Sequence, residues 1–160
     1  MDNSGENVED PRGRAVYEHL VQVHGMYRRE LSRLRDEMTE WESGVSEPAS
    51  RQPGLRDLRM HCARFCDALT AHHSIEDSQM FPGLRGYSPS APAVVDVLES
   101  QHRRIAELLD RVEQTLVALP EDDTAAAGTA AAFRALADEL EAHLDNEENS
   151  LARLFHLRAV

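Results

Sequence analysis

The sequence predicts an all-α protein folded as an antiparallel, up-down-up-down four-helix bundle. No stretch of the chain alternates between apolar and polar residues with the period of two that is typical of strands. Apolar residues instead recur every three or four positions in four segments, which are separated by stretches rich in Gly, Pro and Ser. Because these connections are short, consecutive helices must run in opposite directions. A chain of 160 residues can bury one sizeable core, so we expect a single bundle domain over residues 12–160.

The first helix is expected from about Pro11 to Glu42, after a polar tail over residues 1–11 that we expect to be disordered. Pro11 suits the start because proline is favoured at the first helical position. The predicted apolar stripe of this helix consists of Val16, Leu20, Val23, Tyr27, Leu31, Leu34, Met38 and Trp41. The stretch Ser43–Gly54 is rich in Gly, Pro and Ser, which predicts a loop.

Three more helices follow. We expect the second from Leu55 to Leu84, the third from Ala93 to Leu119, and the fourth from the capping candidates Asp122, Asp123 and Thr124 to about Leu157. Arg85–Pro92 forms the break between the second and the third. The predicted stripe of the second helix consists of Leu55, Leu58, Cys62, Phe65, Leu69, His72 and Glu76. The stripe of the third helix consists of Val94, Leu98, His102, Ile105, Leu109, Val112 and Leu116. The stripe of the fourth helix consists of Phe133, Leu136, Leu140, His143, Glu147, Leu151 and Leu154.

Charge and cysteine content narrow the classes of partner. The formal net charge is −12, from 29 acidic and 17 basic residues, which argues against binding to nucleic acid or to an anionic membrane surface. No apolar run reaches the roughly 20 residues of a membrane span, and the polar start MDNSGENVEDPRGR does not resemble a signal peptide. We therefore expect a cytoplasmic protein whose Cys62 and Cys66 stay reduced and pack in the core, with a redox or metal role as the alternative.

Two of the stripes carry titratable residues where Leu or Val is expected. His72 and Glu76 are four residues apart, so they lie one turn apart on the same helix face. His143 and Glu147 repeat this spacing. Burial of a carboxylate costs several kcal/mol unless the group is paired or bound to a metal. Two buried pairs of this kind therefore predict a bound cation.

Four histidines are predicted to lie at one level of the bundle. The residues His24, His72, His102 and His143 are each about 10 to 14 residues from the same end of the bundle, or roughly 15–21 Å at about 1.5 Å per residue. The four helices are thus expected to bring imidazoles together in one layer of the interior.

The candidate metal ligands are His24, His72, His73, Glu76, His102, His143 and Glu147. Imidazole and carboxylate donors without thiolate suit iron, manganese or zinc, but this set is too large for one tetrahedral zinc ion. It suits two six-coordinate ions that share both carboxylates and an oxo or hydroxo bridge, with one coordination position left open for O₂, peroxide or nitric oxide. His73 lies about 100° from His72 around the helix, so it is either the fifth imidazole or a neighbour of the site. If His73 does not bind an ion, a second coordination position is open.

These motifs resemble the hemerythrin-like (HHE cation-binding) family, in its bacterial single-domain type. The resemblance covers about residues 14–157 and rests on VHGMYRREL, HHSIEDSQMFP, ESQHRRI and HLDNEENSL, in this order. It implies an antiparallel four-helix bundle around a non-haem di-iron centre. By this resemblance the iron ligands are His24, His72, His102 and His143, and the bridging residues are Glu76 and Glu147. Members of the family sense, carry or store O₂, or handle iron, nitric oxide or peroxide.

One position of this chain differs from the O₂ carriers of the family. The carriers have a second histidine four residues after the third-helix histidine, where this chain has Ala106; His73 can compensate for the missing histidine.

Tyr27 is expected to pack beside the site, with a role as hydrogen-bond donor or ligand as the alternative. The remaining residues are expected to support the site or lie outside it: Asp77, Glu148, His19, His61 and His156. A ferritin-type site is disfavoured because Glu-x-x-His occurs only once, from Glu99 to His102.

Three classes of function are compatible with these ligands. The first is a di-iron protein that binds O₂, nitric oxide or peroxide for sensing, storage or redox handling. The second is a di-iron enzyme with catalase-like, peroxidase-like or nitric oxide reductase activity. The third is a metal-stabilised regulatory bundle without turnover. The motifs favour the first two, which need the same open position, and they do not indicate a redox partner.

Overall fold

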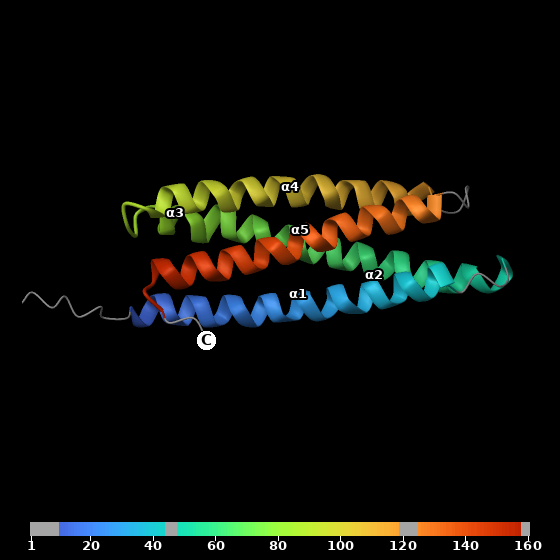
Figure 1. Ribbon diagram of the computed structural model, residues 1–160, viewed down its shortest axis with the longest axis horizontal. Coiled ribbons are helices and arrows are strands. Elements are labelled where there is room, and N and C mark those ends of the chain that lie inside the picture. The colour runs from blue at the N-terminus through green and yellow to red at the C-terminus, as the bar shows by residue number, and fades with distance from the viewer. Residues whose placement is uncertain (1–9, 44–47, 119–124, 158–160) are drawn as a thin grey trace, which may run out of the picture.

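The computed structural model describes residues 10–43, 48–118 and 125–157, which form four long helical rods without strands (Figure 1). The first rod is α1 (Pro11–Ser43). The second is continuous and consists of α2 (Pro48–Ile75), the π-turn η1 (Glu76–Met80) and α3 (Phe81–Arg85). The third is α4 (Ala91–Ala118) and the fourth is α5 (Ala125–Leu154). The predicted all-α four-helix bundle is therefore confirmed. Within the described residues, no helix combines the length and the apolar character that crossing a bilayer requires.

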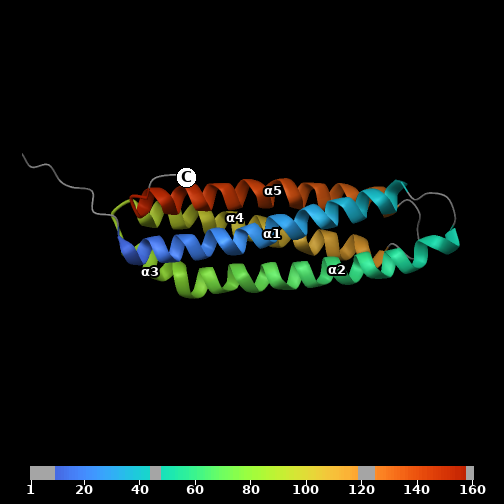
Figure 2. The ribbon, with the colours of Figure 1, turned by 90° about the horizontal axis from the view of Figure 1, so that it is seen from below.

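Contacts between the rods show that neighbours are antiparallel. Arg28 in α1 pairs with Glu148 in α5, and Arg35, two turns later in α1, pairs with Glu141, two turns earlier in α5. The direction of the chain alternates from rod to rod in Figure 1. Figure 2 shows α1 beside both α2 and α5, and these three rods with α4 enclose one interior.

Several predicted boundaries shift. The second rod already begins at Pro48, so the loop expected over Ser43–Gly54 is shorter than predicted. Proline suits a first helical turn, where the backbone N–H needs no partner within the helix. For the same reason α4 begins at Ala91, with Pro92 in its first turn. Most of the predicted tail and the three capping candidates before α5 lie outside the described residues.

The two ends of the bundle have local structures that the sequence explains. Asp10 caps α1, since its Oδ1 accepts a hydrogen bond of 3.0 Å from the backbone N–H of Arg12. The fourth rod ends at Leu154, earlier than expected, in a Schellman motif. In it the N–H of Leu157 donates to the carbonyl of Ala152, and His156 adopts a left-handed φ of 56°.

Two hydrophobic clusters fill the interior, and a polar layer separates them. The larger contains Leu31, Leu69, Ile105 and Leu140 among others, and the smaller contains Leu20, Phe81, Leu98 and Leu151 among others. Along every rod the predicted metal-binding histidine falls between members of the two clusters. The polar layer is therefore enclosed between two apolar clusters.

Two stripe positions differ from the prediction: Val16 is 42% exposed, and Val95 rather than Val94 is fully buried in α4.

Candidate metal centre

The predicted ligand set comes together in the polar layer. The side chains of His24, His143 and Glu147 are completely buried, and Glu76, His102 and His73 are nearly so. His72 is the most accessible of the set, with 12% of its side chain exposed. The set divides into groups whose donor atoms lie within 4.8 Å of one another and could hold a metal ion.

One group consists of three imidazoles. The rings of His73 and His102 stack with their centroids 4.0 Å apart, and Nε2 of His102 lies 3.2 Å from Nε2 of His143. A donor atom of His73 therefore lies within 4.8 Å of donor atoms of His102 and His143, inside the cluster of predicted ligands.

The other group consists of His24 and His72 with Glu76, and the two carboxylates lie between the groups. Glu76 Oε1 is 3.2 Å from Nε2 of His72, and its Oε2 is 3.5 Å from Nε2 of His102. Glu147 Oε2 is 3.3 Å from Nε2 of His24 and 3.7 Å from Nε2 of His143. Each carboxylate therefore faces one histidine of each group.

Three histidines are oriented from behind by polar side chains. The Nδ1 atoms of His24 and His102 lie 2.9 Å from Glu148 Oε1 and 2.7 Å from Asp77 Oδ1, respectively. Since a carboxylate only accepts, each Nδ1–H donates and the Nε2 lone pair faces the centre. Asp77 and Glu148 each directly follow a central carboxylate in the sequence, as expected for residues that support the site.

The third orienting residue, Gln101, was missed by sequence reasoning. Its Oε1 accepts hydrogen bonds of 3.2 Å from Nδ1 of His143 and 3.0 Å from Nδ2 of Asn146. The available signal was its place directly before His102, but glutamine at a half-buried helix position is too common to stand out. Arg28 donates a hydrogen bond of 2.7 Å to Oε1 of Glu148, the same oxygen that Nδ1 of His24 contacts.

The atoms that face the centre lack hydrogen-bond partners. These atoms are Nε2 of His24, His72 and His73 and both carboxylate oxygens of Glu76 and of Glu147. Orphaned polar atoms at this density are rare in a protein interior, where such groups are normally satisfied. Converging imidazole nitrogens and carboxylate oxygens are the donors that divalent cations take. The residues therefore fit bound metal ions.

Burial also shifts the proton equilibria of these groups. Desolvation, with the adjacent charge of Glu147, raises the pKa of Glu76 to about 10. Desolvation and the neighbouring imidazoles lower the pKa of His72 to about 4 and that of His143 to about 3, and they also depress the pKa of His73. Without a cation the centre would keep His72, His73 and His143 neutral and Glu76 protonated.

The helix that carries His72, His73 and Glu76 is not the uninterrupted α-helix that we predicted. At η1 the chain widens into a π-turn, in which the N–H of Phe81 donates to the carbonyl of Glu76. Pro82 gives a physical reason, since it has no N–H and its ring crowds the carbonyl four residues before it. A π-turn contains one residue more than an α-helical turn. It therefore changes which of the following residues point into the bundle. Beyond Glu76, Asp77 and Phe81 both contact His102, the second through rings 5.3 Å apart.

Comparison with known proteins shows the family of the chain. The family model described as the hemerythrin HHE cation binding domain matches residues 15–155. The chain belongs to this family.

Among curated proteins, this HHE domain is similar to the iron-sulfur cluster repair protein YtfE of Cronobacter sakazakii (strain ATCC BAA-894), with 28% identity over 142 residues. The match covers 85% of this chain and 62% of the relative, so the chain spans about three fifths of that protein's length. No solved structure matches the chain. Membership of the hemerythrin family implies that the domain binds cations, with iron as the metal.

Tyr27 forms part of the wall of the HHE site. Its ring stacks on His72 with centroids 5.1 Å apart, and its hydroxyl donates a hydrogen bond of 2.9 Å to the carbonyl of Ala68. The hydroxyl is thus engaged with the backbone, which supports the packing interpretation. His61 lies away from the centre, between Glu30 and Glu37 at 3.0 and 2.8 Å.

The two cysteines lie in the larger hydrophobic cluster. Cys62 and Cys66 are free and buried, and burial raises the pKa of each thiol to about 12. Among the described residues, neither belongs to a group that could hold a metal ion. The two thiols therefore pack as apolar side chains.

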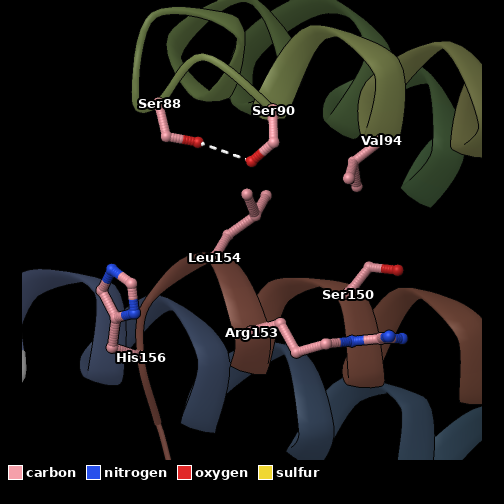
Figure 3. Close-up of a pocket in the computed structure, with 7 residues that line it drawn as sticks. All are labelled: Ser88, Ser90, Val94, Ser150, Arg153, Leu154 and His156. Atoms are coloured by element: carbon pink, nitrogen blue, oxygen red, sulfur yellow. Dashed lines mark hydrogen bonds between the residues drawn. The ribbon is translucent and has the colours of Figure 1, made fainter.

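A cavity of about 350 Å³ at the end of the bundle is separate from this centre. Figure 3 shows Ser88 and Ser90 of the connection before α4 on one side of it, hydrogen-bonded at 3.1 Å, with Arg153 and Leu154 of α5 opposite. The cavity contains none of the predicted metal ligands in its lining. It is not part of the candidate centre.

Proposed function

We propose that this HHE domain holds two iron ions and binds O₂, nitric oxide or peroxide at them. In this proposal His24 and His72 hold one ion, His73, His102 and His143 hold the other, and Glu76 and Glu147 bridge them. The observation that carries the proposal is the position of the carboxylates. Each lies between the two histidine groups, and none of the four oxygens has a hydrogen-bond partner.

The unequal number of histidines supports a site for an exogenous ligand. With shared carboxylates, the ion at His24 and His72 has one protein donor fewer than the other ion. Iron bound there would supply an open coordination position and one-electron redox chemistry. The protein places this side of the centre nearest to solvent, because His72 is the ligand with the most accessible side chain.

The surrounding residues would keep the centre rigid and dry. Glu148 and Asp77 hold two imidazoles with Nε2 toward the metal, and Gln101 holds a third. Hydrogen-bond partners of this kind also raise the basicity of metal-bound imidazoles. The hydrophobic clusters on both sides restrict water, so that a small ligand competes with little solvent.

The match with the cluster repair protein favours a second candidate, in which the bound iron is handed to damaged iron-sulfur clusters. It is supported by a likeness that covers most of this chain, but the relative is longer. Transfer requires iron that exchanges, whereas ligand binding requires iron that stays. Incubation of the iron-loaded domain with an apo-ferredoxin and sulfide separates these candidates. Iron that leaves during cluster assembly would favour repair.

The decisive experiment is metal analysis of the purified protein combined with titration of its reduced form by O₂, nitric oxide and hydrogen peroxide. We expect two irons per chain and a change in the visible absorption spectrum with at least one of these ligands. A stable adduct favours sensing or storage, and continuous release of O₂ from peroxide favours a catalase-like enzyme. A colourless protein that contains only zinc would contradict the proposal and leave a metal-stabilised bundle.

A further inference from the structure

A groove of about 620 Å³ lies between α1 and the second rod, which run side by side in Figure 2. Its lining is predominantly apolar and consists of Ala15, Val16, His19, Leu20, Val23, Tyr27, Ala68, Ala71, His72, Ile75, Glu76 and Met80. Volumes of this size are typical of pockets that bind organic molecules. A diatomic gas or hydrogen peroxide would fill only a small part of it.

The groove reaches the candidate metal centre. His72 and Glu76, which belong to the two-histidine side of the centre, form part of its lining. The side chain of Glu76 is 4% exposed, and neither of its oxygens has a hydrogen-bond partner. A molecule in the groove would therefore place one end beside the candidate metal centre while the rest of it lies on apolar surface.

The chemistry of the lining selects a neutral occupant with an apolar tail. Among the described residues that line the groove, there is no Lys or Arg to hold a carboxylate or phosphate head. Glu76 and the net charge of −12 disfavour anions further. Val16 and Ile75 are 42% and 54% exposed, so a ligand can cover apolar surface that is otherwise in water.

We propose that the groove binds alkyl hydroperoxides, with the alkyl tail along α1 and the hydroperoxide group at the His72–Glu76 end. A hydroperoxide is neutral near pH 7 and can both donate and accept hydrogen bonds. This assignment rests on the proposed function, since it names an organic class of peroxide for the same centre. Reduction of the ligand breaks its O–O bond and gives one alcohol and one water. It takes two protons from solvent and two electrons, one from each of two ferrous ions, which become ferric.

Binding can be tested without turnover. The probes are 1-butanol, 1-hexanol and 1-octanol, which share the tail but cannot be reduced, titrated calorimetrically into the oxidised, iron-loaded protein. We expect the dissociation constant to fall about three- to fourfold for each added CH₂. An affinity that does not depend on chain length would overturn the proposal.

A variant that fills the groove gives the matched test. Ala71→Trp places a large ring in the lining, whereas Ala63→Trp changes an exposed alanine two turns earlier in α2 that does not line it. We expect Ala71→Trp to weaken 1-octanol binding at least tenfold, and Ala63→Trp to leave it within twofold. Iron content is measured in both, and unchanged 1-octanol binding in Ala71→Trp protein that retains its iron would refute the assignment of the groove. Ile75→Gln, at an exposed lining position, should weaken binding in the same direction if Ala71→Trp does not fold.

Single-turnover oxidation of the ferrous protein then separates this inference from the proposed function. Octyl hydroperoxide should oxidise the wild type faster than the Ala71→Trp variant, while hydrogen peroxide oxidises both at similar rates. Equal rates for the two proteins with octyl hydroperoxide would contradict the groove as its site and leave the small-ligand function standing. If neither peroxide oxidises the iron, the proposed function and the redox step fail together, although a chain-length dependence of alcohol binding would still show that the groove holds apolar molecules.

Discussion

His102 and His143, which come from different helices, direct their Nε2 atoms at each other across 3.2 Å. Asp77 Oδ1 accepts a hydrogen bond from Nδ1 of His102, and the side-chain Oε1 of Gln101 accepts one from Nδ1 of His143. Each ring therefore carries its proton on Nδ1, and two Nε2 lone pairs face one another. Such a contact is repulsive unless a cation lies between the two nitrogens. This relationship underlies the predictions on metal content.

Removal of a carboxylate that we propose to bridge the two ions should remove one iron. We expect Glu147→Ala to lower the iron content from two ions to one or none per chain, because this carboxylate contacts a histidine of each group. The metal-free variant should also melt at a higher temperature than the metal-free wild type, since an unpaired buried carboxyl is gone. The control is Glu141→Ala. Glu141 lies on α5, like Glu147, but its side chain is accessible and pairs with Arg35 of α1. Two irons in the purified Glu147→Ala protein, by elemental analysis, would be incompatible with a bridge.

Asp77 should affect metal affinity although we do not expect it to touch the metal. Its hydrogen bond of 2.7 Å fixes the ring of His102, and loss of such a partner typically weakens metal binding by about 10–100-fold. We expect Asp77→Ala to show this loss in a chelator competition assay, and Asp77→Glu to recover part of it. Asp67→Ala, an exposed acid of α2, serves as the control for lost negative charge. Equal affinities of the Asp77→Ala and Asp67→Ala proteins would show that orientation is unimportant.

The metal-free protein should be most stable near pH 6.5, the ordinary pKa of histidine. Burial lowers the pKa of His72 to about 4 and of His143 to about 3, so below pH 6.5 the unfolded chain binds protons that the folded protein does not, and stability falls. Burial raises the pKa of Glu76 from 4.5 to about 10, so between these pH values the unfolded chain releases a proton that the folded protein keeps. Below pH 6.5 the two histidines outweigh this single carboxyl, and above pH 6.5 Glu76 acts alone. Stability therefore also falls between pH 7 and 10.

Iron should reverse the alkaline part of this profile, because bound cations favour the deprotonated ligands. Thermal unfolding between pH 5 and 9, followed by circular dichroism with and without iron, measures both profiles. A metal-free melting temperature that rises steadily from pH 6.5 to 9 would show that Glu76 is not held protonated in the fold.

Gly13 allows the first rod to approach the end of the fourth. A Cβ at this position would lie 2.6 Å from Cδ1 of the buried Phe155, well inside normal contact. We expect Gly13→Ala to destabilise the protein by about 1–3 kcal/mol through overpacking. In Gly128→Ala the new methyl group meets nothing within 4 Å, so this change in α5 should instead stabilise by about 0.5–1 kcal/mol. Urea denaturation of both variants checks the opposite signs, and a stabilised Gly13→Ala protein would contradict this account.

The local pattern was sufficient to predict the bundle and the buried residues that converge at its centre. Helical periodicity is a property of neighbouring residues, so the stripes revealed the rods, and His72, Glu76, His143 and Glu147 stood out because they occupied apolar positions. His24 and His102 were then predicted to lie at the same level, because they are about as far from that end of the bundle as His72 and His143. None of these inferences required knowledge of how side chains meet across the interior.

Packing between the rods decided the remaining features. Gln101 orients His143 from another helix, and the π-turn before Pro82 allows Asp77 and Phe81 to reach His102. The division of five histidines into groups of three and two also depends on which side chains converge from different rods, as does the groove along α1. Periodicity along one helix shows which face is buried. It does not show the rotation and spacing of the helices against one another, which are set by the shapes of all the packed side chains together.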